Sequence, residues 1–356
     1  MSNRIKIFQE KLRENQVDAY LILRSPNIKY YTKSLGGNYL YVPIDYEPTL
    51  FVSQLDANVT KDQAKNCRLE TYTTPTMLKK LTDVIRVSRV LHLSFDDMSH
   101  DLLSKLRKRL PEIKFSQDTN PIWEMRRIKD AEEEKTMLKA GKLADTAMSA
   151  LRAKIIVGVT EYELAAEASF EMMRNGAEAH AFDFTVASGY RSAYPHASVT
   201  ARKIQHGDLI VVDIGASHLG YKSDITRTFI AGRPDKKQHE IYSAVLMAHE
   251  SAFNEMKAGV ACKSVDATAR KIIEDLGYGE KFIHGLGHGV GLEIHEPPSV
   301  SSQSTESLVN GNVVSNEPGI YLHNFGGVRI EDTVLIKGDR PIRLTNYPRS
   351  IDDACF

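Results

Sequence analysis

Short apolar runs alternate with segments of helical periodicity along the first third of the chain. We predict strands at residues 19–23, 49–53, 90–95 and 112–116, and helices at 3–15, 77–86 and 100–110. This alternation is typical of an α/β domain, so we expect a mixed sheet covered by helices. The Gly36–Gly37 pair is interpreted as a turn, because no glycine loop of the phosphate-binding kind is present.

A polar, turn-rich segment, SQDTNP at residues 116–121, follows this first unit. Such a composition is typical of a linker. The chain of 356 residues also exceeds the usual size of a single hydrophobic core. We therefore predict two domains, residues 1–121 and 122–356.

The second domain opens with two segments of helical periodicity, each introduced by a capping box. Asp130 with Glu133 and Thr160 with Glu163 have the spacing in which two side chains satisfy free backbone N–H groups reciprocally. Gly176 is expected to end the second helix. We predict helices after both boxes.

The pattern of this domain then recurs with little side-chain identity. A helix capped by Ser264 and ended by Gly277 would correspond to the helix ended by Gly176. The other corresponding segments are 158–159 with 259–260, 182–189 with 283–290, 209–213 with 312–317, and 224–230 with 331–336. We predict two similar halves related by a pseudo-twofold axis.

Each half carries two acidic residues beside an apolar run. Asp213 and Asp224 flank a predicted two-residue hairpin centred between His218 and Leu219, which would place them directly opposite each other. Like charges that face each other in an apolar sheet are costly, and a bound dication removes that cost. A solvated face is the alternative interpretation of one such pair.

The second half repeats this arrangement and adds a histidine. Glu317 and Glu331 flank a longer loop at residues 323–327, and His288 lies in the glycine-rich stretch HGLGHGVGLEIHE. Four carboxylates and one imidazole suit a pair of hard or borderline divalent cations. We predict a metal site formed by Asp213, Asp224, His288, Glu317 and Glu331. Mn²⁺ or Co²⁺ fits this oxygen-rich set best, and Zn²⁺ and Fe²⁺ are alternatives.

Composition excludes several classes of partner. The formal net charge is zero and no block of Lys or Arg stands out, which argues against nucleic acid and anionic membranes. No apolar run reaches membrane-spanning length, and the N-terminal segment has no signal-peptide core. The three cysteines are far apart and form no CxxC, as expected of reduced thiols. We expect a cytoplasmic location.

Several motifs together resemble a known family. VVDIGA…SDITRTF, HGLGHGVGLEIHE, EPGIY and GGVRIED are similar to the creatinase/aminopeptidase group of "pita-bread" metallopeptidases, in its Xaa-Pro peptidase branch of prolidase and aminopeptidase P. The resemblance implies an α/β N-terminal domain followed by an α+β pita-bread catalytic domain. It also implies a homodimer that cleaves Xaa-Pro bonds with a hydroxide that bridges two metal ions.

The resemblance assigns roles to individual residues. Asp213 would bind one metal ion, Asp224 and Glu331 would bridge both ions, and His288 with Glu317 would complete the second site. Glu317 would also be the general base. The remaining expected site residues are His196 and His295, which would contact the substrate and assist catalysis, His284, which would line the proline pocket, and Arg329, which would orient the carboxylates.

Substrate length is left open by the sequence. The compact N-terminal domain favours an Xaa-Pro dipeptidase, whereas the loop at residues 296–312 contains no Arg or Lys to bind a dipeptide's carboxylate. An aminopeptidase P acting on longer peptides with proline second is therefore the alternative. A methionine aminopeptidase does not usually have this N-terminal domain, and a non-catalytic peptide-binding relative would have lost metal ligands.

Overall fold

The protein divides into two compact units, one ending at Arg126 and the other spanning Arg127–Phe356. A computed structural model describes residues 4–356, so residue 3 of the first predicted helix lies outside the described range. None of the described helices is both long enough and apolar enough to cross a membrane.

The first unit is built on a six-stranded sheet with strand order β4-β3-β2-β1-β5-β6. Strand β1 pairs antiparallel with β2 and parallel with β5, so the sheet is mixed, as predicted. Its elements are α1 (Arg4–Glu14), β1 (Ala19–Ile22), α2 (Ser25–Thr32), β2 (Tyr39–Pro43), β3 (Thr49–Ser53), α3 (Ala57–Gln63), β4 (Arg68–Tyr72), α4 (Met77–Val87), β5 (His92–Phe95), α5 (His100–Arg109), β6 (Lys114–Gln117) and α6 (Asn120–Arg126). Strand β4 lies at the sheet edge and is partly exposed, so its sequence RLETY gave too weak an apolar pattern to predict it.

The segment predicted as a linker, residues 116–121, belongs instead to the first unit. Its polar residues serve local structure, because Asp118 accepts a hydrogen bond from the backbone N–H of Asn120 (3.0 Å) at the start of α6. Helix α6 is tied to the same unit by an ion pair from Lys11 to Glu124 (2.6 Å) and a hydrogen bond from Arg126 to Asn27 (2.5 Å). The unit boundary therefore follows Arg126 rather than Pro121.

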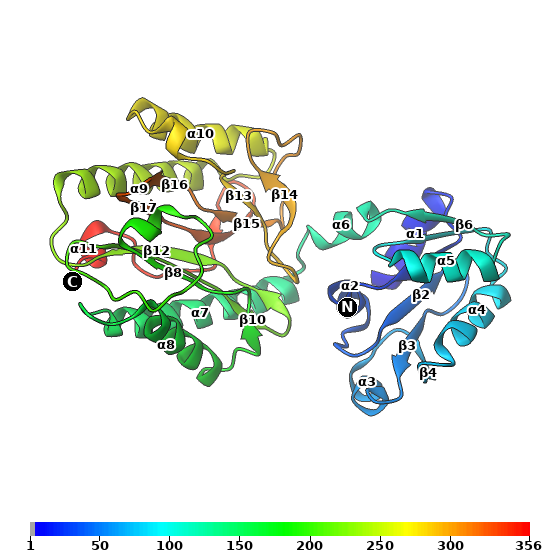
Figure 1. The fold of residues 1–356 in the computed structure, drawn as a ribbon. Helices are drawn as coiled ribbons and strands as arrows, with labels where there is room; N and C mark the ends of the chain where they lie inside the picture. Colours follow the sequence, from blue (N-terminus) through cyan, green and yellow to red (C-terminus); the bar gives the residue numbers. More distant parts are fainter. Residues whose placement is uncertain (1–3) are drawn as a thin grey trace. The chain divides into compact units, whose positions relative to one another are not determined.

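The second unit consists of two halves that share the order of their main elements, a helix pair, two strands, a hairpin and a further strand, which confirms the predicted repeat (Figure 1). The first half contains α7 (Ala131–Lys154), α8 (Glu161–Arg174), β7 (Ala179–His180), β8 (Thr185–Ser188), η1 (Gly189–Ala193), β9 (Leu209–Ile214), β10 (Ala216–His218), β11 (Tyr221–Lys222) and β12 (Ile225–Ile230). The second contains α9 (Lys236–Glu255), α10 (Cys262–Asp275), η2 (Gly279–Lys281), β13 (Gly287–Gly289), β14 (Glu296–Val300), β15 (Val313–Asn316), β16 (Gly319–Leu322), β17 (Gly326–Arg329), β18 (Asp332–Leu335), β19 (Ile342–Arg343) and α11 (Ile351–Ala354). Strand order β12-β9-β8 in one half matches β18-β15-β13 in the other.

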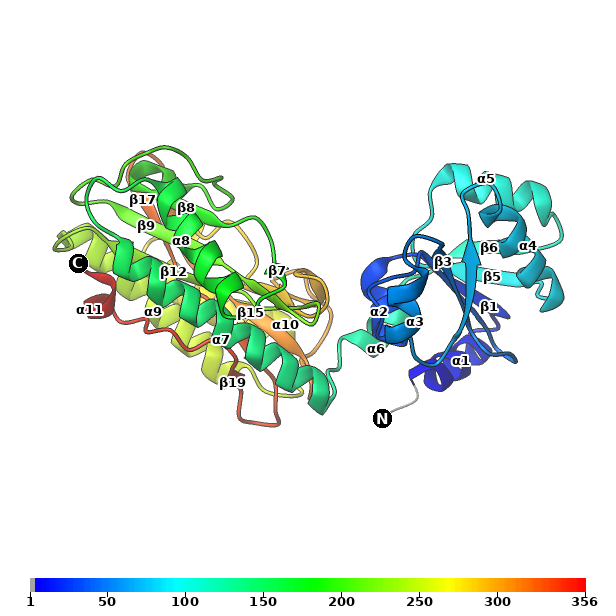
Figure 2. The same cartoon turned by 90° about the horizontal axis from the view of Figure 1, so that it is seen from below.

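Each half packs a helix pair against its own strands. Buried residues of α7 and α8 form one apolar core with β8, β9 and β12, and those of α9 and α10 form another with β15, β17 and β18. The strands lie between the two helix pairs in Figure 1, and α7 and α8 lie in front of them when seen from below (Figure 2). This arrangement places the strand ends that carry acidic residues at the centre of the unit.

Helix starts agree with the sequence in two of three cases. Both capping boxes are formed, at Asp130 and at Thr160. Ser264 does not cap α10, which begins at Cys262 after Ala261. A tertiary contact sets this helix start. The backbone N–H of Cys262 donates to the backbone oxygen of Glu306 (2.9 Å), which fixes the chain against a distant loop at the first residue of α10.

A glycine inside α7 provides a test of the packing. A Cβ at Gly141 would lie 2.0 Å from the backbone oxygen of Leu344, so Gly141→Ala must push the C-terminal segment away. Helix propensity alone would stabilise this variant by about 1 kcal/mol, whereas overpacking of a close contact costs about 1–3 kcal/mol. We expect a lower melting temperature by differential scanning fluorimetry. Ser149→Ala, on an exposed face of the same helix, is the control and should melt no earlier than wild type; a more stable Gly141→Ala would contradict the packing.

Candidate metal centre

The two aspartates of the first half lie on one face of a β-ribbon. Strand β9 pairs with β12 so that Asp213 stands opposite Thr226, and Asp224 precedes β12 by one residue. The aspartates are therefore diagonal neighbours. The prediction that they lie directly opposite each other was wrong. The turn is Leu219–Gly220, one position later than expected, and both residues have positive φ (47° and 79°). Gly220 adopts this conformation without strain and so sets the register.

The two glutamates of the second half face each other directly. Asn316 pairs with Asp332 in one sheet and Gly319 pairs with Arg329 in the other, which places Glu317 opposite Glu331 between them. The opposition was predicted, and the connecting loop between β16 and β17 is shorter than the five residues expected, because Gly326 already pairs with Leu322.

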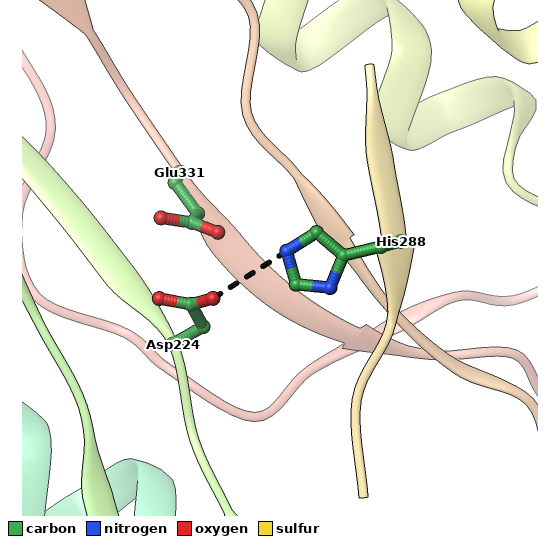
Figure 3. A group of neighbouring side chains, drawn as sticks. All are labelled: Asp224, His288 and Glu331. Carbon is green, nitrogen blue, oxygen red and sulfur yellow. Dashed lines mark ion pairs between the residues drawn. The ribbon is translucent and has the colours of Figure 1, made fainter. Parts of the chain in front are cut away.

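His288 projects from β13 toward these carboxylates. Its Nε2 lies 3.3 Å from Glu317 Oε1 and 3.7 Å from Asp224 Oδ2. Its Nδ1 is 3.1 Å from the backbone oxygen of Gly289, which leaves Nε2 to face the acidic groups. One ligand atom each from Asp224, His288 and Glu331 lies within 4.8 Å of the others (Figure 3).

The acidic groups have unfilled capacity for a positively charged ligand. Asp224 and Glu331 are buried, and the oxygens Asp213 Oδ1, Asp224 Oδ1 and Glu331 Oε1 are buried without a hydrogen-bond partner. Burial, together with the neighbouring carboxylates, raises the pKa of Asp224 and Glu331 well above the usual range. A divalent cation would supply both the missing charge and the missing partners, so these residues fit a metal site.

Glu317 differs from the other three acids because its pKa is lowered rather than raised. Burial alone would raise its pKa, but the hydrogen bond and charge of His288 outweigh burial and lower the pKa. The same contact outweighs burial to raise the pKa of His288. A proton on His288 and a bound cation therefore compete for the same lone pair.

Arg329 lies beside the carboxylates. It is 3% exposed. Its guanidinium donates to Asp213 Oδ2 (2.7 Å), to Thr226 Oγ1 (3.1 Å) and to the hydroxyl of Tyr321 (3.0 Å). Thr226 in turn donates to Glu331 Oε2 (2.7 Å). One hydrogen-bonded chain thus fixes acids from both halves of the repeat.

Two supporting threonines were missed from the sequence, although a signal is present. Thr226 follows Asp224 by two residues, and Thr333 follows Glu331 by two. Each threonine supports the acid of the other half, because Thr226 contacts Glu331 and Thr333 Oγ1 bonds to the backbone N–H (3.0 Å) and oxygen (2.8 Å) of Asp224. The repeated acid-x-Thr pattern could have indicated this.

The remaining histidines lie in the same cavity as the acids. The His295 ring is 4.3 Å from the His288 ring, and His284 Nε2 is 2.9 Å from the Tyr321 hydroxyl. Burial lowers the pKa of both His284 and His295. A cavity of about 950 Å³ is lined by all the predicted site residues, namely His196, Asp213, Asp224, His284, His288, His295, Glu317, Arg329 and Glu331.

Comparisons with known proteins agree with this geometry. Residues 135–338 match metallopeptidase family M24, and residues 4–128 match the creatinase/prolidase N-terminal domain. The chain is 39% identical over 355 residues to an Xaa-Pro dipeptidase from Pyrococcus horikoshii, with 99% of each chain covered.

Solved structures show the same similarity over nearly the whole chain. An Xaa-Pro dipeptidase from Bacillus anthracis has a TM-score of 0.95 at 30% identity and 99% coverage of each chain. An X-Pro aminopeptidase from Thermotoga maritima has a TM-score of 0.89 at 32% identity, covering 96% of this chain and 99% of that one. The chain therefore belongs to metallopeptidase family M24, in which it joins a creatinase/prolidase N-terminal domain to a peptidase domain of pita-bread fold.

Proposed function

We propose that this peptidase is an Xaa-Pro dipeptidase that uses two divalent metal ions. The observation that carries the proposal is the convergence of four carboxylates and His288 on one cavity, with buried oxygens that have no partner. The similarity to Xaa-Pro dipeptidases over 99% of the chain supports the substrate class.

We propose that the ligands divide between the two ions as the family resemblance implies. Asp213 would hold one ion, His288 and Glu317 the other, and Asp224 with Glu331 would bridge them. Four oxygen ligands and one nitrogen favour Mn²⁺ or Co²⁺, with Zn²⁺ and Fe²⁺ as alternatives. When bound, two such cations lower the pKa of a water molecule and polarise the substrate carbonyl.

The chain's own residues supply proton transfer and substrate contacts. Glu317 accepts the proton of the attacking water and passes it to the departing proline nitrogen. His196 and His295 line the cavity beside the acids and donate hydrogen bonds to the substrate. His284, fixed by Tyr321, forms a wall of the proline pocket. Arg329 holds Asp213 in place.

An Xaa-Pro aminopeptidase acting on longer peptides is the second candidate. Ser299 and Ser301 place the loop at residues 296–312 on the cavity wall, where it offers hydroxyl groups. Among the described residues that line the cavity, Arg329 is the one arginine or lysine, and Asp213 already occupies it. The carboxylate of a dipeptide would therefore lack a free cation there.

We further propose that the protein acts as a cytoplasmic homodimer. Cys67, Cys262 and Cys355 are free thiols, as is usual in a reducing compartment. The dimer is supported by the family resemblance of the sequence motifs.

Removal of one acidic charge should stabilise the metal-free protein. The raised pKa of Asp224 means that its ionised form destabilises the fold, and this penalty grows as pH rises above its unfolded-state value. In EDTA at pH 8, Asp224→Asn should melt a few degrees higher than wild type, because each kcal/mol added to the free energy of unfolding raises the melting temperature by about 2–4 °C. Added Mn²⁺ should raise the melting temperature of wild type and not that of the variant. Asp339→Asn, at an exposed site, is the control; an unchanged melting temperature of Asp224→Asn in EDTA would argue against buried repulsion.

Loss of Glu317 should affect chemistry and metal binding together. Glu317→Gln keeps the size of the side chain but removes the proton acceptor and one anionic ligand, so kcat should fall by about 10²–10⁴. Inductively coupled plasma mass spectrometry after dialysis should show fewer than two Mn²⁺ ions bound per chain. Glu280→Gln, on the exposed η2 segment, should leave both values unchanged. Near-normal turnover by Glu317→Gln would remove Glu317 from its assigned role.

Substrate length can be decided with two peptides. Metal-stripped protein is supplied with Mn²⁺, Co²⁺, Zn²⁺ or Fe²⁺ in turn and assayed on Ala-Pro and Ala-Pro-Ala. We expect cleavage of Ala-Pro alone, which would identify a dipeptidase. Cleavage of Ala-Pro-Ala would instead establish the second candidate, and failure to cleave either peptide with any of the four metals would contradict both.

A further inference from the structure

Arg227 is a fully buried arginine on β12 that does not line the cavity. It is 1% exposed. Its Nε donates to the backbone oxygen of Pro348 (2.9 Å), and Nη2 donates to Asp332 Oδ1 (2.8 Å) and to the backbone oxygen of Tyr347 (2.6 Å). Its Nη1 donates to the backbone oxygens of Thr226 (2.8 Å) and Glu331 (2.5 Å). All the N–H groups of the guanidinium therefore have acceptors.

The contact with Glu331 is notable because of where Glu331 lies. It occupies the break between β17 and β18, where the chain leaves one sheet and enters another. Its backbone N–H bonds to Thr226 (3.0 Å), its backbone oxygen accepts from Arg227, and its carboxylate accepts from Thr226 Oγ1. Thr226 and Arg227 of the opposite half thus hold the main chain and the side chain of Glu331.

A buried ion pair keeps the guanidinium in this position. Asp332, the residue after Glu331, is completely buried and also faces Arg343 Nε (3.3 Å), Arg349 Nε (3.1 Å) and His249 Nε2 (3.4 Å). Asp332 Oδ1 lies 2.8 Å from Arg227 Nη2, and both side chains are almost completely buried. This contact anchors the guanidinium beside Glu331.

The second half of the repeat has no arginine equivalent to Arg227. By the correspondence of β12 with β18, the position equivalent to Arg227 in the second half is Val334, an apolar residue. The equivalent acid, Asp224, is held by Thr333 without such an arginine. Arg227 therefore gives Glu331 a contact that Asp224 does not have.

We propose that Arg227 is a positioning residue for the metal centre, which fixes Glu331 across the boundary between the two halves so that its carboxylate stays beside Asp224. This inference rests on the proposed metal-dependent function. The planar fork of a guanidinium reaches Glu331, Asp332 and the Tyr347 backbone at once, and a lysine cannot replace it. Outer partners of metal ligands typically contribute a factor of about 10–100 in metal affinity.

The test compares Arg227→Lys with Arg343→Lys. Both variants keep a positive charge near Asp332, but the guanidinium of Arg343 contacts Asp332, Glu250 and the Phe253 ring rather than Glu331. Mn²⁺ binding is followed by isothermal titration calorimetry, and melting temperatures are measured in EDTA. Kinetics with Ala-Pro and Ala-Pro-Ala are measured over a range of Mn²⁺ concentrations.

We expect Arg227→Lys to bind Mn²⁺ at least about tenfold more weakly, because Glu331 would contact both ions. Its kcat on the peptide that wild type cleaves should recover as Mn²⁺ is raised, with KM near that of wild type. Arg343→Lys should bind Mn²⁺ like wild type even if it melts earlier. Wild-type Mn²⁺ affinity at both sites in Arg227→Lys would overturn the inference and leave Arg227 with a purely structural role.

A second variant covers the case in which Arg227→Lys does not fold. Asp332→Asn keeps the shape and the acceptor oxygen but removes the charge that anchors Arg227, so it should also weaken Mn²⁺ binding. Wild-type affinity in Asp332→Asn would then overturn the inference. Failure of wild type itself to bind two Mn²⁺ ions would instead contradict the proposed function, so the two failures are distinguishable.

Discussion

Repulsion among buried carboxylates is the constraint on which the second unit depends. Asp213, Asp224, Glu317 and Glu331 lie in one cavity, and burial shifts the pKa of three of them upward. The positive charge that the chain provides there comes from Arg329 and His288. Divalent metal ions would balance this arrangement, and the surrounding hydrogen bonds hold the acids in position for them.

The internal repeat explains how so many acids reach one place. Asp213 lies on β9, and Glu317 directly follows the equivalent strand β15. Asp224 precedes β12, and Glu331 precedes the equivalent strand β18, so the pseudo-twofold axis brings two pairs of acids together. Support then crosses between halves: Thr226 contacts Glu331, and Thr333 contacts Asp224. A site shared in this way is complete only when both halves are folded and docked, which couples its assembly to the fold of the whole unit.

Much of this was accessible from the sequence because it rests on local patterns. The structure contains the capping boxes at Asp130 and Thr160 and the opposition of Glu317 and Glu331, which follow from short-range spacing. It also contains the mixed sheet and the repeat, which follow from the order of local patterns along the chain. The set of cavity residues followed from motif resemblance, which carries tertiary information that periodicity does not.

The predictions that were wrong share one physical cause: at those places tertiary contacts, rather than the local sequence, determine the structure. The hairpin register depended on Leu219 and Gly220 both adopting positive φ, where the sequence offered His218–Leu219 as well. The polar residues at 116–121 could have formed a linker but start a helix that packs on its own unit. The start of α10 was set by pairing with a loop more than forty positions away, at Glu306. The contacts of Arg227 with Glu331 and Tyr347 likewise join residues that no local pattern connects.

The most direct test of the account is a crystal structure of the protein soaked in Mn²⁺, with anomalous differences collected near the manganese edge. The account predicts two anomalous peaks in the cavity, both within coordinating distance of Asp224 and Glu331, one also beside Asp213 and the other beside His288 and Glu317. A single peak, peaks outside these side chains, or no peak at saturating Mn²⁺ would contradict the central claim that the acids of the two halves form one dinuclear metal centre.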